Sequence, residues 1–376
     1  MKLFAVKEQR QDERRVALSA ETARKFIDAG LEVTVESGAG VAAAIPDKAY
    51  EAAGATLVTD RAKGLGEADI ILSVQGLESA DAGAVKSGAF HLALLNPFGE
   101  RDRLEALAKA GITAFSMEFV PRITRAQSMD VLSSQANLAG YRAVLDAAHT
   151  FGRAMPMMMT AAGTIPPAKV LVMGAGVAGL QAIATAKRLG AVVHATDVRP
   201  AAKEQVESLG GKFVMVEDEE TEAAETEGGY AREMSDAYKK KQAALIEETI
   251  AKMDLVITTA QIPGRPAPEL VSDAMIETMK PGSVIVDLAV ETGGNVSASK
   301  PGEVVEHGGV TIVGHRNVPS LVAADASQFL ARNLMHFLSP HIKEGRFDPD
   351  MEDQIIQDSL VCRDGAIVHE RLKDAG

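Results

Sequence analysis

The sequence predicts an α/β protein with two doubly wound domains that are joined by long helices. Short apolar runs alternate with helical stretches over residues 1–120, and the same alternation returns after residue 168. Such alternation is typical of a mostly parallel sheet with helices on both of its faces. The length of 376 residues is sufficient for two domains with separate cores.

The first domain has helices with recognisable ends. Ser19 can cap a helix that extends to about Ala29, and Gly111 can end another helix over residues 102–110. The apolar runs that we expect to form strands are Leu3–Val6, Leu31–Val35, Thr56–Val58, Asp69–Val74, Phe90–Leu95 and Thr113–Met117.

A glycine motif in this domain imitates a dinucleotide fingerprint. Gly38-x-Gly40-x-x-Ala43 follows a strand, and Asp60 lies 20 residues after Gly40. However, Pro46 places the next helix start well after Gly40, so the helix dipole would miss a bound phosphate. We therefore interpret this motif as a structural glycine loop.

Two long helices are expected to connect the domains. The first begins near Ser133 or Ser134, and the second opens within residues 314–327. The methionine run Met157–Met159 follows the first helix, and we expect it to be adaptable core filler. The predicted domains are a discontinuous N-terminal domain, residues 1–134 plus 327–376, and a second domain, residues 135–326.

Residues 169–199 have the order strand, turn, helix, strand. The strand 170–173 leads into Gly174-x-Gly176-x-x-Gly179, and a helix follows. Gly174 permits the tight turn, Gly176 lets a pyrophosphate approach the backbone, and Gly179 lets helix and strand pack closely. The N-terminus of the helix faces the phosphates. The pattern predicts a Rossmann-type dinucleotide site.

An acidic residue ends the second strand of this unit. Val192–Thr196 leads directly to Asp197, where a carboxylate can accept hydrogen bonds from the adenosine ribose. Asp197 would repel a 2′-phosphate, which favours NAD over NADP, although the nearby Arg199 weakens this preference. Residues 170–186 carry no charge, but the glycines at the junction indicate a buried strand–helix unit rather than a membrane span.

A polar segment interrupts the second domain. Residues 217–241 are acidic and poor in large apolar side chains, and Gly228-Gly229 precedes Tyr230. A segment of this kind is either a solvated insertion or a functional loop. We expect Tyr230 to be the tip of a closing flap. Later strands are expected at 255–259, 283–288 and 310–313, with a C-terminal hairpin over 360–368.

The composition excludes several classes of function. The chain has 39 Lys and Arg against 52 Asp and Glu, a net charge of −13, so nucleic acid is not an expected partner. Cys362 is the only cysteine, which rules out an internal disulfide and a cysteine-based zinc or iron–sulfur site, and no metal is expected. The N-terminus shows no secretory signal.

Several motifs together resemble the alanine dehydrogenase/transhydrogenase family, over nearly the whole chain and most specifically between residues 118 and 325. Within it, the resemblance is to the NAD(H)-binding component of proton-translocating transhydrogenases. The motifs are ERRVALS, PRITRAQSMDVLSSQANLAGYRAV, the fingerprint at 169–199, EQVESLGGKF, GGYAREM, VIVDLAVETGGN and GHRNVPSLVAADAS.

The resemblance implies roles for individual residues. Arg122, Gln127 and Asp130 match the polar trio at the nicotinamide end of NADH, so they are the expected catalytic residues, and Ser133 matches a further contact. The full set that we expect to bind NAD(H) is Gly174, Gly176, Val177, Gly179, Asp197, Val198, Arg122, Gln127, Asp130, Ser133, Gly229 and Tyr230.

The resemblance also implies an activity and an assembly. Hydride would pass between NADH on this chain and NADP+ on a partner subunit, coupled to proton translocation, in the Si-specific/Re-specific class of transhydrogenase. The chain would form a homodimer and bind a membrane-helix subunit and an NADP(H)-binding beta subunit. It would be cytoplasmic and peripheral on the cytoplasmic face of the bacterial inner membrane.

Alanine dehydrogenase is the alternative within the family, because amino-acid oxidation needs a proton acceptor. Arg15 matches the arginine of that branch, but Gln75 stands at its lysine position and Glu291 at its aspartate position. Its histidine position falls near Asn96, without a histidine. We interpret the nearby His91 and His315 as structural. A non-catalytic NADH sensor would share the fingerprint but would not need the RITRAQSMD segment.

Overall fold

The computed structural model describes residues 1–216, 235–262 and 264–373. The chain forms two compact units. Unit 1 comprises Met1–Gln135 and Pro319–Gly376, and unit 2 comprises Ala136–Val318. The chain thus returns to unit 1 at Pro319. The sequence analysis placed this return later, at residue 327. Among the described residues, no helix is both long enough and apolar enough to cross a membrane.

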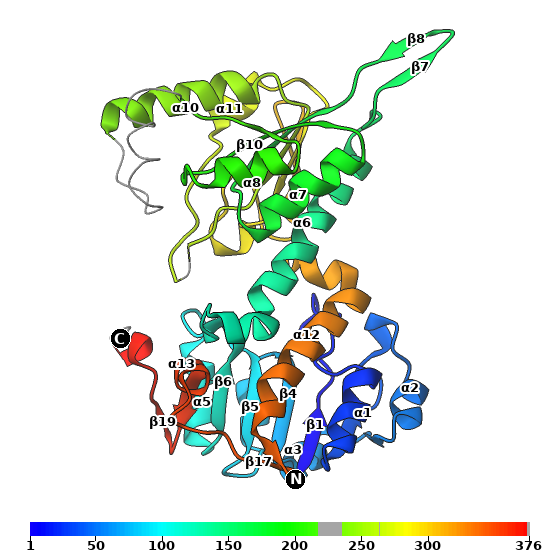
Figure 1. The fold of residues 1–376 in the computed structure, drawn as a ribbon, viewed down its shortest axis with the longest axis vertical. Helices are drawn as coiled ribbons and strands as arrows, with labels where there is room; N and C mark the ends of the chain where they lie inside the picture. The colour runs from blue at the N-terminus through cyan, green and yellow to red at the C-terminus, as the bar shows by residue number, and fades with distance from the viewer. Residues whose placement is uncertain (217–234, 263, 374–376) are drawn as a thin grey trace. The chain divides into compact units, whose positions relative to one another are not determined.

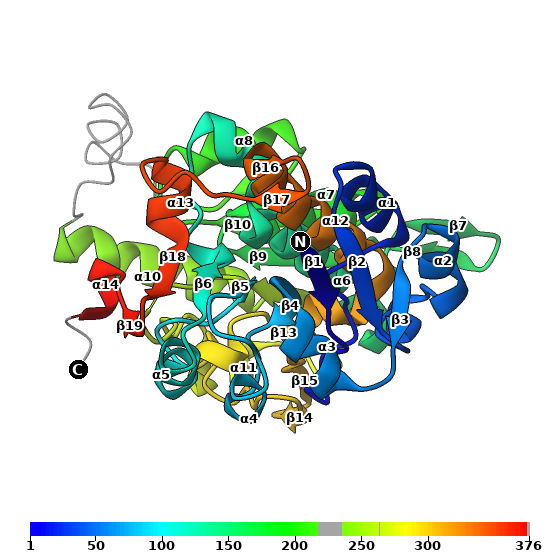
Figure 2. The same ribbon diagram turned by 90° about the horizontal axis from the view of Figure 1, so that it is seen from below.

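Unit 1 is a sheet of eight strands in the order β19-β18-β6-β5-β4-β1-β2-β3, seen from below in Figure 2. The six strands from β1 to β6 are parallel and have the order 3-2-1-4-5-6 of a doubly wound dinucleotide fold. The strands are β1 (Lys2–Ala5), β2 (Glu32–Glu36), β3 (Thr56–Val58), β4 (Ile70–Gln75), β5 (Phe90–Leu94), β6 (Thr113–Ser116), β18 (Leu360–Arg363) and β19 (Ala366–Ile367).

Helices cover both faces of this sheet. Ser19 caps α1 and forms a capping box with Thr22, so the predicted N-cap is confirmed. The helices of unit 1 are α1 (Ala20–Asp28), α2 (Asp47–Ala52), α3 (Arg61–Glu67), α4 (Ser79–Ala82), α5 (Arg101–Lys109), α12 (Ala323–Leu338), α13 (Gln354–Ser359) and α14 (Glu370–Lys373).

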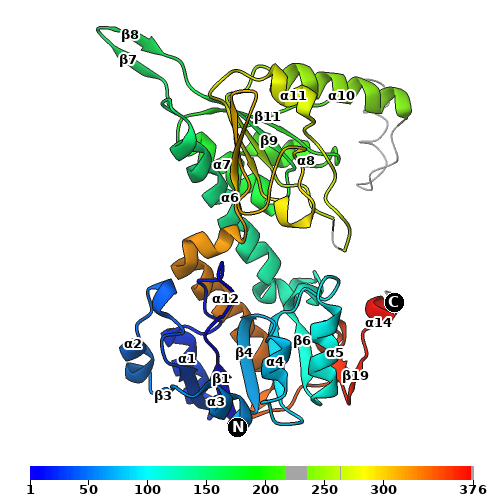
Figure 3. The same ribbon diagram turned by 180° about the vertical axis from the view of Figure 1, so that it is seen from behind.

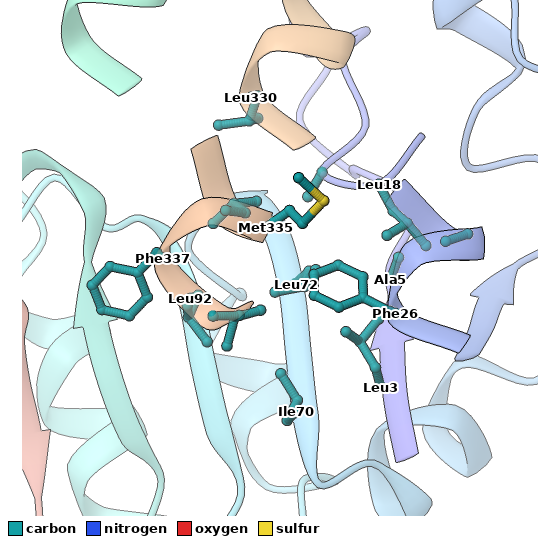
Figure 4. Packing of buried hydrophobic residues seen from close by; sticks show 14 of the residues in the cluster. Leu3, Ala5, Leu18, Phe26, Ile70, Leu72, Leu92, Leu330, Met335 and Phe337 are labelled. Atoms are coloured by element: carbon teal, nitrogen blue, oxygen red, sulfur yellow. The ribbon is translucent and has the colours of Figure 1, made fainter. Parts of the chain in front are cut away.

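Strand side chains alternate between two apolar cores. On β1, Leu3 and Ala5 belong to one core, and Phe4 belongs to the other. Figure 4 shows the first core, in which side chains of α12 pack among those of the strands and α1. The side chains labelled there are Leu3, Ala5, Leu18, Phe26, Ile70, Leu72, Leu92, Leu330, Met335 and Phe337.

The six parallel strands of unit 2 repeat this strand order. Its sheet has the order β11-β10-β9-β12-β13-β15-β14, in which only the edge strand β14 is antiparallel. Its strands are β9 (Lys169–Met173), β10 (Val192–Thr196), β11 (Lys212–Phe213), β12 (Leu255–Thr258), β13 (Val284–Asp287), β14 (Val304–His307) and β15 (Val310–Val313). Its helices include α7 (Val177–Arg188), α8 (Ala202–Ser208), α10 (Asp236–Ile250) and α11 (Asp273–Thr278). The predicted α/β class with two Rossmann-like sheets is confirmed.

The first long helix starts earlier than predicted. Helix α6 (Val131–Thr150) begins before Ser133 because Asp130 performs the capping role, accepting a hydrogen bond from the Ser133 backbone nitrogen at 2.8 Å. The first turn of α6, up to Gln135, belongs to unit 1, and the rest of the helix belongs to unit 2 (Figure 1).

The prediction that Met157–Met159 fill a core is wrong. Met158 begins β7 (Met158–Thr160), which pairs with β8 (Gly163–Ile165) in a hairpin that projects from the body of unit 2 (Figures 1 and 3). The exposed fractions of Met157, Met158 and Met159 are 57%, 44% and 75%. An apolar run of three residues does not distinguish an exposed hairpin from a buried segment.

The glycine motif at Gly38 is structural, as expected. A short 3-10 helix, Val41–Ala43, does begin at once after Gly40, whereas the sequence placed the next helix start at Pro46. A Cβ atom on Gly40 would lie 2.8 Å from the hydroxyl oxygen of Tyr50 and 2.9 Å from the Ile45 side chain. The chain itself fills the space that a phosphate would need.

Candidate active site

The turn between β9 and α7 places each fingerprint glycine in a different environment. Gly174 has φ +104°, in the left-handed region that favours glycine, and its backbone nitrogen donates to the Thr196 carbonyl oxygen at 2.8 Å. A Cβ atom on Gly179 would collide with the Gly174 carbonyl oxygen, whereas a Cβ atom on Gly176 would have no neighbour within 4 Å. Space for a ligand is therefore left beside Gly176.

The N-terminus of α7 has free hydrogen-bonding capacity. Gly176 is its N-cap residue and supplies no side-chain cap, so first-turn backbone N–H groups lack that partner. Val177, the first helical residue, is 39% exposed. The aligned peptide dipoles make such a terminus favourable for a phosphate group.

Asp197 lies at the end of β10, where its carboxylate is held by four hydrogen bonds. Oδ2 accepts from the Ala175 backbone nitrogen at 2.7 Å and from Arg199 Nη2 at 3.0 Å. Oδ1 accepts from the backbone nitrogen and from Nε of Arg199, both at 2.9 Å. Burial alone would raise the pKa of Asp197, but these hydrogen bonds outweigh it and lower the pKa, so the carboxylate is ionised. Val198 beside it is 87% exposed.

A loop that the sequence did not single out lies beside the fingerprint turn. Thr259 follows β12, and its hydroxyl donates to the Gly174 carbonyl oxygen at 3.1 Å. Asn295 holds the next residue, Ala260, at both ends, accepting from its backbone nitrogen at 3.0 Å and donating to its carbonyl oxygen at 2.9 Å. Asp287 in turn accepts from the Asn295 backbone nitrogen at 3.0 Å.

This loop is at the point where the strand order of unit 2 reverses, between β9 and β12, where ligands of doubly wound sheets bind. Asn295 and Asp287 are fully buried. The sequence shows Asp287 at the end of an apolar run and Asn295 after two glycines, and both positions could have been noted as candidates. The hydrogen bonds between Asn295 and Ala260 join distant segments, so they could be found only in the folded chain.

The segment that contains the predicted catalytic residues belongs to unit 1. Arg122 is exposed, and Gln127 is exposed on a 3-10 helix, η3 (Thr124–Met129). Neither side chain has a hydrogen bond within the described stretches of the chain. Asp130 and Ser133 are half-buried and bind one another, with the Ser133 hydroxyl 2.6 Å from Asp130 Oδ2. Ala126 and Met129 anchor the helix in the core of the unit.

Two contacts fix this 3-10 helix from outside. Asn333 on α12 donates to the Ser128 carbonyl oxygen at 2.8 Å and accepts from the Ser134 hydroxyl at 2.8 Å. Arg125 makes two hydrogen bonds of 2.7 Å to Asp353, which lower the pKa of that carboxyl to about 2. The pair therefore stays charged at neutral pH, and it is lost only as the pH falls from about 3.8, the ordinary pKa, toward 2.

Replacement of Asn333 by alanine should lower the free energy of unfolding by about 1–3 kcal/mol, because two hydrogen bonds that are partly buried are lost. Urea denaturation measures this loss. Arg332→Ala is the matched control, since Arg332 is an exposed neighbour on α12 that binds Glu21 at the surface, and its effect should stay within about 0.5 kcal/mol. Equal losses in the two variants would contradict this role for Asn333.

The reversal point of the unit 1 sheet holds a buried polar network around Arg15. Its Nε and Nη2 donate to the two carboxylate oxygens of Glu13 at 2.8 and 2.6 Å, and its Nη1 donates to Gln135 at 2.8 Å. Gln75 donates to Glu13 at 2.9 Å. Burial raises the pKa of the adjacent Glu8 to about 8. Chain groups thus already bind the guanidinium and neutralise its charge.

His91 has the surroundings of a structural residue. It is fully buried, its Nε2 lies 2.8 Å from the Ser73 hydroxyl, and burial lowers its pKa to about 3. It therefore stays neutral at physiological pH. Among the described residues no cluster of His, Cys, Asp or Glu could hold a metal ion.

Two models of one protein family together match nearly the whole chain. The family model "Alanine dehydrogenase/PNT, N-terminal domain" matches residues 4–139, and "Alanine dehydrogenase/PNT, C-terminal domain" matches residues 143–370. The chain is 56% identical over 383 residues to a protein of Rhodospirillum rubrum that is named as the first portion of the NAD(P) transhydrogenase alpha subunit, with all of both chains covered.

Two solved structures resemble it closely. A transhydrogenase from Sinorhizobium meliloti is 53% identical, with a TM-score of 0.90 and coverage of 98% of this chain and 100% of that one. An L-alanine dehydrogenase is 26% identical, with a TM-score of 0.83 and coverage of 100% and 99%.

Proposed function

The chain belongs to the alanine dehydrogenase/PNT family, and from this premise we propose that it is the NAD(H)-binding subunit of a proton-translocating transhydrogenase. In this proposal, hydride passes between NADH on this chain and NADP+ on a partner subunit, coupled to proton translocation, in the Si-specific/Re-specific class. High identity to a transhydrogenase subunit over its full length supports the activity.

The observation that carries the proposal is the network around Arg15. Oxidation of an amino acid needs a group that takes a proton at the reacting centre. Gln75 stands in this network where the alanine dehydrogenase branch has its lysine, and its amide, which donates to Glu13, cannot take that proton. Transfer of a hydride between two nicotinamides needs no such group.

The residues present are suited to NAD(H). The open space at Gly176 and the uncapped terminus of α7 would take the pyrophosphate, and Asp197 would take the adenosine ribose. Bound NADH would supply the hydride. What the chain contributes is placement, because two reacting carbons must come within roughly 3–3.5 Å for transfer.

We assign the contacts at the nicotinamide end to Arg122, Gln127, Asp130 and Ser133. The exposed side chains of Arg122 and Gln127, which have no hydrogen-bond partner among the described residues, support this assignment, as does the hold of Asn333 on their segment. Gly229 and Tyr230 lie outside the described residues, so their contact with the cofactor stays a prediction.

An activity assay distinguishes the candidates. The purified chain, combined with its NADP(H)-binding partner subunit, should catalyse reduction of NADP+ by NADH, and it should not reduce NAD+ with L-alanine. Sustained turnover of alanine would favour the alternative activity. Binding of NADH without transfer to NADP+ in the complete complex would instead indicate a sensor.

We also propose that the chain works as a homodimer within a larger complex. The complex would include a membrane-helix subunit and an NADP(H)-binding beta subunit, and the chain would lie on the cytoplasmic face of the bacterial inner membrane. The apolar hairpin β7–β8 supports the dimer, because side chains as exposed as Met159 and Ile165 usually mark an interaction surface when they cluster.

Met159→Glu should convert the dimer into a monomer, since a carboxylate would have to be buried in the apolar contact. Sedimentation velocity at micromolar concentration measures the change. Val41→Glu is the control, because Val41 is a 64% exposed apolar residue of unit 1 that is not on the hairpin. A Met159 variant that stays dimeric would remove the hairpin from the interface.

A further inference from the structure

In this structure, the hydrogen bonds at Asp197 leave no acceptor position of its carboxylate free for the hydroxyls of a ribose. A carboxylate offers about four acceptor positions, two on each oxygen. Here two are taken on Oδ1 and two on Oδ2, three of the four by Arg199 and one by the Ala175 backbone. The residue that should bind the nucleotide is therefore saturated by its own chain.

The four donors differ in how easily they can leave. The backbone nitrogens of Ala175 and Arg199 are fixed by the turn and stay in place. The two guanidinium nitrogens belong to a side chain that is 55% exposed, whereas the Asp197 side chain is 7% exposed. Moving the guanidinium into solvent needs no change of the fold. It frees one acceptor position on each carboxylate oxygen, which matches the two hydroxyls of an adenosine ribose.

We propose that Arg199 is a specificity-determining residue that competes with the ribose for Asp197 and, once released, is the group able to bind a 2′-phosphate. This inference rests on the proposed binding of NAD(H) at the fingerprint. In the native protein the ribose hydroxyls displace the guanidinium, and Asp197 then excludes a 2′-phosphate by charge. Asp197 thus has two effects. Its charge excludes a 2′-phosphate, and in the empty site its carboxylate binds the Arg199 guanidinium.

The chemistry of the two side chains explains both effects. A planar guanidinium binds a phosphate through two parallel hydrogen bonds as readily as it binds a carboxylate. While Asp197 is charged, a phosphate of about two negative charges meets a carboxylate at the same place. When the carboxylate is removed, the repulsion ends and the guanidinium is free for the phosphate.

Three variants test this proposal through the affinities for NADH and NADPH, measured by nucleotide fluorescence on the full chain. Arg199→Ala should bind NADH about 2- to 10-fold more tightly, because no guanidinium has to be displaced, and should not bind NADPH better. Asp197→Asn should bind NADH about 10-fold more weakly and NADPH at least 10-fold more tightly. The double variant should lose the gain for NADPH.

Arg188→Ala is the matched control, since Arg188 is an exposed arginine in the last turn of α7, and it should leave both affinities unchanged. Thermal unfolding shows whether each variant is folded. A double variant that keeps the NADPH affinity of Asp197→Asn would overturn the role of Arg199, as would unchanged NADH affinity in Arg199→Ala. If the native chain bound no NADH, the proposed function itself would fail.

Discussion

Gly179→Ala should leave unit 2 unable to fold normally, with a loss of about 3 kcal/mol or more in the free energy of unfolding. The new Cβ atom would overlap the Gly174 carbonyl oxygen and lie 2.8 Å from its carbonyl carbon. Both are backbone atoms of the β9–α7 turn, which cannot move away as a side chain can. The helix would have to separate from the strand, and apolar contacts under α7 would be lost.

Gly176→Ala is the matched variant, and the contrast makes the result specific. Its Cβ atom would have no neighbour within 4 Å, and its φ of −77° suits any residue. We expect normal stability but an NADH affinity lower by about 100-fold, because the methyl group occupies the space of the pyrophosphate. Urea denaturation and calorimetric titration measure the two properties. Two variants with the same defect would refute this division of roles.

Gln127→Asn should slow the hydride step by on the order of 100-fold while NADH affinity stays nearly constant. The Gln127 side chain is exposed and has no hydrogen bond within the described chain, so its shortening by one methylene should not affect stability. If catalysis is placement of two nicotinamides, a small shift of one contact is costly in rate.

Single-turnover transfer to NADP+ with the partner subunit measures this rate, alongside NADH affinity. Ser128→Ala is the control, because Ser128 is the exposed neighbour on the same 3-10 helix and contributes its backbone carbonyl, not its side chain, to the contact with Asn333. A normal rate in Gln127→Asn would place this residue outside the reacting centre.

Local patterns were sufficient to predict much of the fold. The central strands of both sheets were visible as apolar runs, since their side chains are buried on both faces. The separate roles of the fingerprint glycines could be assigned from the sequence. A tight turn, the approach of a ligand to the backbone and the close packing of helix and strand each depend on neighbouring residues. The cap at Ser19 is equally local. Each of these signals lies within a few residues of the feature that it predicts.

Features that depend on distant residues could not be predicted in the same way. The clamp of Asn333 on Ser128 joins segments that are far apart in the chain. The exposure of Met159 follows from a hairpin that leaves the body of unit 2, and its composition suggests burial instead. The saturation of Asp197 is local, but it depends on a rotamer of Arg199 that a sequence does not specify.

The discontinuity of unit 1 has a consequence for biosynthesis. Strand β18 pairs with β6, and the N-terminal ammonium group of Met1 donates to the Gly345 carbonyl oxygen at 2.7 Å. Residues that are synthesised after unit 2 therefore complete a sheet whose other strands are synthesised before it. Unit 2 is continuous and can fold while β6 still has an unpaired edge, which is open to wrong pairing. Hydrogen exchange on ribosome-bound chains that end before β18 should therefore find the amides of β9 and β12 better protected than those of β6.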